Sequence, residues 1–309
     1  MLQVEIYDSK TLKLLTTLED VSGDELIVEV KERVRENIPH LNTARQSLRL
    51  QPRGKSLDDH EKLYLIKGVN AGDRLQLYLK DLGPQIGWKT VFILEYLGPL
   101  VIYPLFFVRF PWLYGSQYAY QYPKHVVVRL ALACWTFHYA KRLYETMWVH
   151  RFSHATMPFT NLFKNCTYYW LFAAFVSFHI NHPFYTPPHF GSLRMILGLS
   201  GFVIGEIGNY SIHVAMSNLR PPGSKVRRIP LPTSNPFTIL FDFVSVPNYT
   251  YEILAWFSFS IMTQCLPALM FAMCGAYQMT IWALAKHKAY KKEFASYPQH
   301  RRAIFPFIL

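Results

Sequence analysis

Apolar and polar residues alternate over short runs in the first part of the chain. The alternation in residues 1–21 predicts a β-hairpin. Helical spacing of the apolar residues predicts a helix over residues 24–37, with Asp24 as its N-cap. Residues 46–59 and 73–81 are each typical of a further strand. The pattern therefore predicts a ββαββ order in about 80 residues.

Beyond Trp88 the pattern changes to long apolar runs. They cover residues 91–108, 126–139, 168–184, 195–216 and 251–284. A helix needs about 20 residues to cross a bilayer, so the last run is long enough for two spans, broken near Pro267. We predict six spans, and residues 237–246 form a short or re-entrant segment that would make a seventh.

The two patterns divide the chain into two predicted domains. The ββαββ order of residues 1–82 resembles the ubiquitin-like β-grasp fold. Residues 83–309 are predicted to be embedded in a membrane. The predicted fold class is thus a multi-spanning α-helical membrane protein with six to seven transmembrane helices and an N-terminal ubiquitin-like β-grasp domain.

Charge separates the same two parts. Residues 1–82 hold 13 Lys or Arg and 14 Asp or Glu, so the net charge of +12 comes from the apolar part. That part has only six acids, which are Glu95, Glu145, Glu206, Asp242, Glu252 and Glu293. A basic excess beside spans marks cytoplasmic loops, here the proline-rich stretch 217–236 and the tail 286–309. A site for an anionic ligand would also be basic, whereas nucleic acid fits poorly with so apolar a chain.

Several polar residues interrupt the apolar runs and are candidates for a functional site. Glu95 lies inside the first run, where a carboxylate is either functional or interfacial. Tyr139, Arg142 and Glu145 are spaced three residues apart and share a helix face. Asn209 and His213 form a polar ridge that faces either a cavity or another helix.

Two other patterns are weaker indications of function. Gly201, Gly205 and Gly208 follow no strand, so we interpret them as contacts for close helix packing and not as a dinucleotide fingerprint. The pairs His150/His154 and His179/His182 are separated by a predicted span and should face opposite sides of the membrane, so we expect no metal site. The four cysteines lie in apolar runs without a pairing pattern, and we expect no disulfide.

Specific strings then give a resemblance that covers almost the whole chain. They are "KDLGPQIGW", "EYLGP", "HYAKRLYETMWVHRFSHATMP", "NLFKNC", "NHPFYTPP", "PNYTYE" and the ending "IFPFIL". The chain resembles the very-long-chain trans-2-enoyl-CoA reductases of the steroid 5α-reductase family. The resemblance implies NADPH-dependent reduction of trans-2-enoyl-CoA to saturated acyl-CoA. This is the last step of very-long-chain fatty acid elongation and is also relevant to sphingolipid metabolism.

The resemblance also implies catalytic residues. The Tyr of the Pro-Asn-Tyr turn carries over to Tyr249 as the acid that protonates the substrate. Glu95 and Tyr139 would hold the substrate carbonyl, and which of the two tyrosines protonates stays open. The basic pair Lys141 and Arg142 would act with Glu145, which would orient them.

The cofactor implied by the resemblance is NADPH, held by polar helix faces. By position its contacts would be Lys164, Asn209, His213, Arg220, Asn248, Glu252 and Tyr290. His213 departs from the wider family, which has an Asp there. Asn248 and Glu252 are four residues apart and share a helix face, while Tyr249 points about 100° away toward the substrate. Arg227 and Arg228 are further candidates for the 2′-phosphate of the cofactor.

Location and partners follow from the same resemblance. It implies an endoplasmic reticulum membrane protein whose N-terminal domain and active site face the cytosol. The partners would be long-chain trans-2-enoyl-CoA, membrane lipid and other fatty acid elongase components. Three alternatives stay open, which are a steroid or polyprenol enone reductase, a non-catalytic membrane scaffold and a di-iron oxygenase. Chain-length preference and oligomeric state cannot be read from the sequence.

Overall fold

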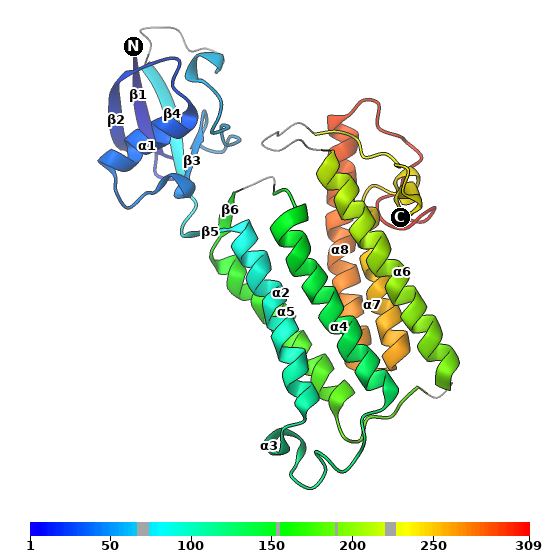
Figure 1. Ribbon diagram of the computed structural model, residues 1–309. Helices are drawn as coiled ribbons and strands as arrows, with labels where there is room; N and C mark the ends of the chain where they lie inside the picture. Colours follow the sequence, from blue (N-terminus) through cyan, green and yellow to red (C-terminus); the bar gives the residue numbers. More distant parts are fainter. Residues whose placement is uncertain (67–73, 153–154, 189–190, 220–226) are drawn as a thin grey trace. The chain divides into compact units, whose positions relative to one another are not determined.

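A computed structural model describes the chain except for residues 67–73, 153–154, 189–190 and 220–226. The described residues form two compact units. Unit 1 comprises Met1–Gly87 with His154–Leu162, and unit 2 comprises the remainder (Figure 1). Each unit is described separately below.

Unit 1 is built on a four-stranded sheet with one helix packed against it (Figure 1). Its strand order is β2-β1-β4-β3, in which β1 runs parallel to β4 and the other pairs are antiparallel. Alternate residues of β1 and β4 are buried against the helix, as the period of two in a strand requires. The elements are β1 (Leu2–Asp8), β2 (Leu14–Val21), α1 (Ile27–Asn37), β3 (Gln46–Arg49) and β4 (Arg74–Asp81).

Two details of unit 1 differ from the prediction. The helix begins at Ile27, so Asp24 is not its N-cap; the Glu29 carboxylate instead accepts the backbone N–H of Leu26 at 2.7 Å. Glu29 in the first turn also interacts favourably with the helix dipole, while the Asp24 carboxylate pairs with the Lys62 ammonium at 3.1 Å. The predicted strand over residues 46–59 ends at Arg49, since a turn with Pro52 and Gly54 follows.

Short elements complete unit 1. A bidentate ion pair between Arg45 and Asp81 joins the start of β3 to the end of β4 at 3.0 and 2.6 Å. The hydrogen bonds from Arg45 lower the pKa of the Asp81 carboxyl below its ordinary value. The remaining elements are the 3₁₀ turns η1 (Thr43–Arg45) and η2 (Leu63–Leu65) and a two-stranded antiparallel ladder of β5 (Gln85–Gly87) with β6 (Thr156–Pro158).

Unit 2 is a bundle of long helices that run side by side (Figure 1). Tyr103, Trp135, Phe202 and Phe259 are among the side chains that fill its apolar core. The long helices are α2 (Trp88–Val108), α4 (Val126–Tyr144), α5 (Thr160–Asn181), α6 (Gly191–Asn218), α7 (Pro247–Thr263) and α8 (Leu266–Glu293). The short elements are α3 (Pro111–Tyr114), the π-helical turn η3 (Glu145–Val149) and the 3₁₀ helix η4 (Pro236–Asp242).

Among the described residues, three helices are long and apolar enough to cross a membrane, namely α2, α6 and α8. The predicted break in the last apolar run is confirmed, because Gln264 adopts a left-handed φ of 47° and Pro267 opens α8. The segment proposed as a seventh span is a 3₁₀ helix of seven residues, too short to cross a bilayer. The count of six spans stays a prediction.

The glycines of α6 allow it to pack closely against α7, as the sequence predicted. A Cβ atom added at Gly205 would lie 2.8 Å from the carbonyl oxygen of Tyr251 and 2.8 Å from the backbone nitrogen of Ala255. One added at Gly208 would overlap the ring of Tyr251, and one at Gly201 would overlap Ser258 Oγ. Backbone cannot move aside as a flexible side chain can, so Gly205 sets the distance between the two helices.

We expect Gly205→Ala to lower the thermal unfolding temperature of the detergent-purified protein by several degrees. Overpacking a tight contact costs about 1–3 kcal/mol, and here the contact is with backbone atoms. Gly275→Ala in α8 is the matched control, because its added Cβ would meet nothing closer than 3.6 Å. The control should keep the wild-type temperature; equal losses in both variants would refute the packing role of Gly205.

Candidate functional site

A cluster of buried charged side chains lies in the apolar bundle of unit 2, and its centre is Lys141 near the end of α4. The ammonium group of Lys141 lies 2.9 Å from a carboxylate oxygen of Glu206 on α6 and donates to Asn209 Oδ1 at 2.8 Å. His138, one turn earlier on α4, contacts the other oxygen of Glu206 at 2.7 Å. Glu206 is only 2% exposed, so α4 and α6 are joined by an ion pair shielded from water.

A second group of contacts surrounds Arg142. Its guanidinium donates to Glu145 at 3.0 Å and to the hydroxyl of Tyr96 on α2 at 2.7 Å. Glu145 is fully buried and also lies 3.1 Å from His213 of α6 and 3.8 Å from Lys141. The predicted pairing of Lys141 and Arg142 with Glu145 is therefore present in the structure. Burial strengthens these charge-assisted contacts relative to the same contacts in water.

The start of α7 joins this cluster through the side chain of Glu252 and the backbone carbonyl of Asn248. Glu252 contacts His138 at 3.4 Å and accepts the indole N–H of Trp256 at 3.1 Å. Asn209 donates to the backbone carbonyl of Asn248 at 3.0 Å. The Asn248 and Glu252 positions of α7 are thus linked to α4 and α6, which agrees with the face predicted from their spacing.

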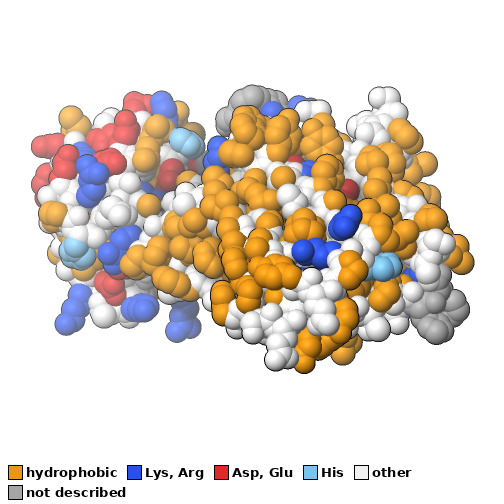
Figure 2. Space-filling view, turned by 60° about the horizontal axis from the view of Figure 1, so that its bottom comes forward, with side chains coloured by type: hydrophobic (Ala, Val, Ile, Leu, Met, Phe, Trp, Pro, Cys, Tyr) orange, Lys and Arg blue, Asp and Glu red, His pale blue; other side chains and the backbone are white. Residues whose placement is uncertain are grey.

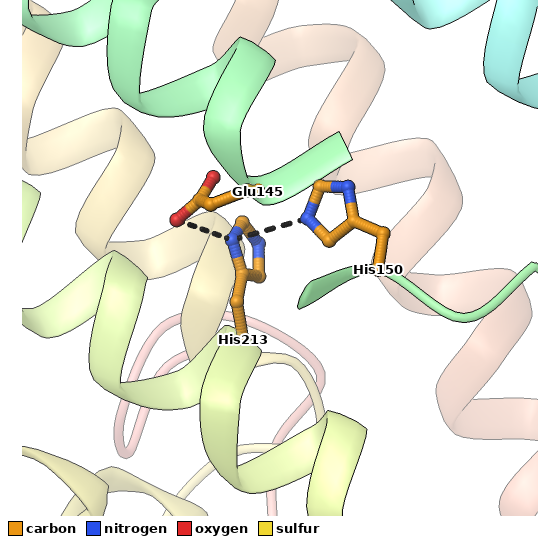
Figure 3. A group of neighbouring side chains, drawn as sticks. All are labelled: Glu145, His150 and His213. Carbon is orange, nitrogen blue, oxygen red and sulfur yellow. Dashed lines mark hydrogen bonds and ion pairs between the residues drawn. The ribbon is translucent and has the colours of Figure 1, made fainter. Parts of the chain in front are cut away.

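His150 and His213 lie beside Glu145, and the three side chains converge as Figure 3 shows. Their ligand atoms all lie within 4.8 Å of one another, a spacing that could hold a metal ion. However, Glu145 already accepts Arg142 at 3.0 Å, and the Arg142 guanidinium also lies 3.4 Å from His213 Nδ1. A divalent cation there would have to lie against an arginine, so the charge distribution favours a hydrogen-bonded network over a metal site.

The proton state of His150 agrees with such a network. Burial, with the nearby Arg142 as a further cause, lowers the pKa of His150 to about 3. Its imidazole is therefore neutral at physiological pH and can serve as a hydrogen-bond partner of His213 at 3.4 Å. The spacing to His154 cannot be compared, because His154 lies outside the described residues. His182, by contrast, lies beside Arg109 at the other end of the bundle.

Glu95 and Tyr139 are both buried, as residues that hold a substrate group would be. Glu95 forms a hydrogen bond with Asn165 of α5, and its Oε2 atom has no partner among the described residues. The hydroxyl of Tyr139 is also buried and, in the described part of the chain, unpaired. Buried polar atoms normally find partners, so unpaired ones are candidates for binding a ligand.

Tyr249 lies at the first turn of α7 and packs with Val246 and Ile253. It lies within electrostatic range of Arg142, Glu252 and Tyr290. Tyr290 is half-buried, with its ring stacked on Tyr297. Tyr249 is therefore near the charged cluster, although it forms no direct contact with Lys141 or Arg142 among the described contacts.

The contacts of two further predicted cofactor residues cannot be added to this cluster from the described part of the chain. Lys164 is exposed on α5, and no contact joins it to the cluster in the described part of the chain. Arg220 lies outside the described residues. Arg227 is described and pairs with Glu293 at 2.8 Å.

The structure adds residues that the sequence did not single out. Tyr96 and Glu206 contact the basic pair directly, and His138 bridges Glu206 to Glu252. A feature of the sequence could have identified each of them as a site candidate. Tyr96 follows Glu95, His138 precedes Tyr139, and Glu206 is one of only six acids after residue 82. Each signal identifies a polar residue in a span, but only the fold shows what it contacts.

Comparisons with known proteins agree with both units. Residues 155–309 match the family model described as 3-oxo-5-alpha-steroid 4-dehydrogenase, and residues 2–81 match the TECR ubiquitin-like domain. The chain is 52% identical to a probable very-long-chain enoyl-CoA reductase of Caenorhabditis elegans over 99% of both chains. It is 51% identical to a very-long-chain enoyl-CoA reductase of Dictyostelium discoideum over 75% of this chain and 74% of the relative.

A third relative extends the comparison to mammals. A trans-2,3-enoyl-CoA reductase-like protein of Mus musculus is 40% identical over 99% of this chain and 84% of its own length. Members of this family are reductases, which usually use a nicotinamide cofactor, and the apolar helices indicate a membrane protein. The family models match residues 2–81 and 155–309, and the relatives from Caenorhabditis elegans and Mus musculus each match 99% of the chain. The chain therefore belongs to the steroid 5α-reductase family and, within it, to the very-long-chain enoyl-CoA reductases.

Proposed function

We propose that this chain reduces the double bond of a long-chain trans-2-enoyl-CoA to give the saturated acyl-CoA, with NADPH as reductant. The reaction would complete each cycle of very-long-chain fatty acid elongation and so also supply acyl chains for sphingolipids. The observation that carries the proposal is the basic pair Lys141–Arg142, buried in an apolar bundle beside the first turn of α7. Relatives named as very-long-chain enoyl-CoA reductases, one of them matching 99% of the chain, support the substrate class.

The residues present fit a nicotinamide cofactor. Asn248 Oδ1 is buried without a partner among the described residues, and Asn209 and His213 lie on the adjoining face of α6. We propose that these residues hold NADPH with Arg220, Glu252 and Tyr290, and that Arg227 or Arg228 meets its 2′-phosphate. The exposed Lys164 has less support for this role. When bound, NADPH supplies the hydride that adds to the β-carbon of the enoyl group.

The side chains of this chain would stabilise the negative charge on the thioester oxygen and deliver a proton to the α-carbon. Negative charge develops on the thioester oxygen as the β-carbon is reduced, and preorganised donors stabilise such charge best. Tyr139 and Glu95 would hold this oxygen, Glu95 in its protonated form, while Arg142 supplies positive charge. Tyr249 would donate its phenolic proton to the α-carbon and regain one from solvent. Glu145 and Glu206 would keep the basic pair in position.

Location completes the proposal. The acyl chain would lie among the helices of an endoplasmic reticulum membrane, and CoA and NADPH would enter from the cytosol, on the side of the N-terminal domain. Association with other elongase components is part of the proposed pathway. The basic loop and tail support the cytosolic orientation of the cluster.

The test is NADPH oxidation by the purified full chain with trans-2-hexadecenoyl-CoA, and with a 3-oxo-4-ene steroid in parallel. We expect turnover with the enoyl-CoA, formation of hexadecanoyl-CoA, and much slower turnover when NADH replaces NADPH. Turnover with the steroid alone would replace the proposed substrate, since the family model carries a steroid description. Inactivity with both substrates, in protein that binds NADPH, would favour the scaffold alternative.

A further inference from the structure

We propose that a basic pocket at the end of unit 2 away from the charged cluster binds a phosphate ester, such as the headgroup of an anionic phospholipid. The pocket has a volume of about 440 Å³ and combines three basic side chains with aromatic ones. It is formed by the end of α2, the segment that leads to α4, and the first turn of α4. Its lining residues are Phe107, Arg109, Ala119, Tyr120, Tyr122, Pro123, Lys124 and Arg129.

Arg109 gives the pocket a fixed positive charge. It is 2% exposed and donates to the backbone carbonyls of Asn181 at 2.6 Å, Tyr122 at 2.7 Å and His182 at 3.4 Å. Two of these carbonyls lie at the C-terminus of α5, so Arg109 also caps that helix. A helix end offers only about half a negative charge, so part of the arginine charge stays uncompensated.

Lys124 and Arg129 add two more charges at the same place. The Lys124 ammonium lies 4.7 Å from the centre of the Phe107 ring, and burial lowers the pKa of this group. Within the described part of the chain, no carboxylate lies within 4 Å of either residue or of Arg109. Three neighbouring cations without a counter-ion repel one another, and an anion bound among them would remove that cost.

The acids of unit 2 lie too far away to neutralise these three cations. Glu95 lies on α2 fourteen residues before Arg109, which is about 21 Å along a helix. Glu145, Glu206 and Glu252 belong to the charged cluster at the other end of α4. The last two acids are Asp242 in η4 and Glu293 at the end of α8, which belong to the cluster end of the bundle (Figure 1).

The surroundings favour a lipid as the source of the phosphate. Figure 2, in which this end of the bundle comes forward, shows basic side chains set in a largely apolar surface. Leu105, Val108 and Trp112 are 49%, 46% and 81% exposed beside the pocket, as expected for residues that face acyl chains and the interface. Arg and Lys bind phosphate oxygens through charge-assisted hydrogen bonds, as the phosphate group of a lipid headgroup would require.

The experiment is thermal unfolding of the full chain, purified in an uncharged detergent, with dioctanoyl phosphatidic acid, dioctanoyl phosphatidylcholine or inorganic phosphate. We expect phosphatidic acid to raise the unfolding temperature by about 3 °C or more at saturation, with little effect of phosphatidylcholine. The double variant Lys124→Gln/Arg129→Gln should lose more than half of that shift. Arg109 is left unchanged because its variants would uncap α5.

Arg194→Gln is the matched control, since it removes a charge from the same end but pairs with Gln264 outside the pocket. It should keep the full shift. The pair Lys124→Arg/Arg129→Lys keeps both charges and should also keep it, which separates loss of binding from loss of folding. An equal shift from inorganic phosphate, lost in the double variant, would identify free phosphate as the source. Equal lipid shifts in all variants, or no shift with any anion, would overturn the proposal.

Discussion

Tyr249→Phe is expected to lower kcat for reduction of trans-2-enoyl-CoA by about 10²- to 10⁴-fold, the usual contribution of a general acid. The substitution removes one hydroxyl and almost no volume. The ring packs with Val246, Ile253 and Met279, and a phenylalanine ring can make the same contacts. The affinity for NADPH should therefore stay within about twofold of wild type, because the hydroxyl of Tyr249 is not among the proposed cofactor contacts.

Tyr251→Phe provides the matched control for this experiment. Tyr251 lies two residues further along the same helix, and its hydroxyl donates to the carbonyl of Phe237 at 2.9 Å. Losing that bond should cost about 1 kcal/mol of stability without a large effect on kcat. Single-turnover rates and NADPH titrations of both variants test whether Tyr249 is the general acid. Wild-type turnover by Tyr249→Phe would exclude Tyr249 as the acid, and Tyr139 would be the next residue to test.

Much of the fold could be predicted because local pattern and tertiary structure agree. In unit 1 the period of two in β1 and β4 and the helical period of α1 match the buried faces. In unit 2 the glycine series of α6 predicted a close helix contact, which the structure has against Tyr251 and Ala255. Element boundaries were less predictable, since Asp24 pairs with Lys62 and α1 begins three residues later, at Ile27.

The candidate site could be predicted only where its contacts are local in sequence. Arg142 and Glu145 are three residues apart, so their spacing placed them on one helix face, and the resemblance linked Lys141 to the same carboxylate. The contact of Arg142 with Tyr96 spans 46 positions, and that of Lys141 with Asn209 spans 68. No periodicity within one helix specifies which helix lies opposite. Lys164 was predicted to contact the cofactor but is exposed in the structure. A basic residue near a helix start can face solvent as readily as a site.

Glu206 is the clearest case of a residue whose importance depends on the fold. Its two oxygens contact His138 at 2.7 Å and Lys141 at 2.9 Å, and it is 2% exposed. Removing one partner of a buried ion pair leaves the other charge uncompensated, which costs about 3–5 kcal/mol. We therefore expect Glu206→Gln to lower the free energy of unfolding by about 3 kcal/mol, although the amide keeps the shape of the side chain.

Glu206→Gln should also lower kcat, independently of its effect on stability. Without Glu206, Lys141 keeps only its contacts with Asn209 and the more distant Glu145, so its ammonium group is less well positioned. A misplacement of about 1 Å in a catalytic group can cost about 10²-fold in rate. We expect a loss of that order in kcat at a temperature where the variant is fully folded, with a smaller change in KM, since Glu206 does not contact the substrate directly.

Glu293→Gln is the appropriate comparison for Glu206→Gln. Glu293 also pairs with a basic residue, Arg227 at 2.8 Å, but their side chains are 36% and 49% exposed. Solvent screens such a pair, so its loss should cost less than about 1 kcal/mol and leave kcat at saturating NADPH unchanged. Chemical unfolding and steady-state kinetics on both variants measure the contrast. If the two variants behave alike, burial of the Lys141–Glu206 pair does not matter, and the charged cluster does not hold the basic pair in position for the reaction.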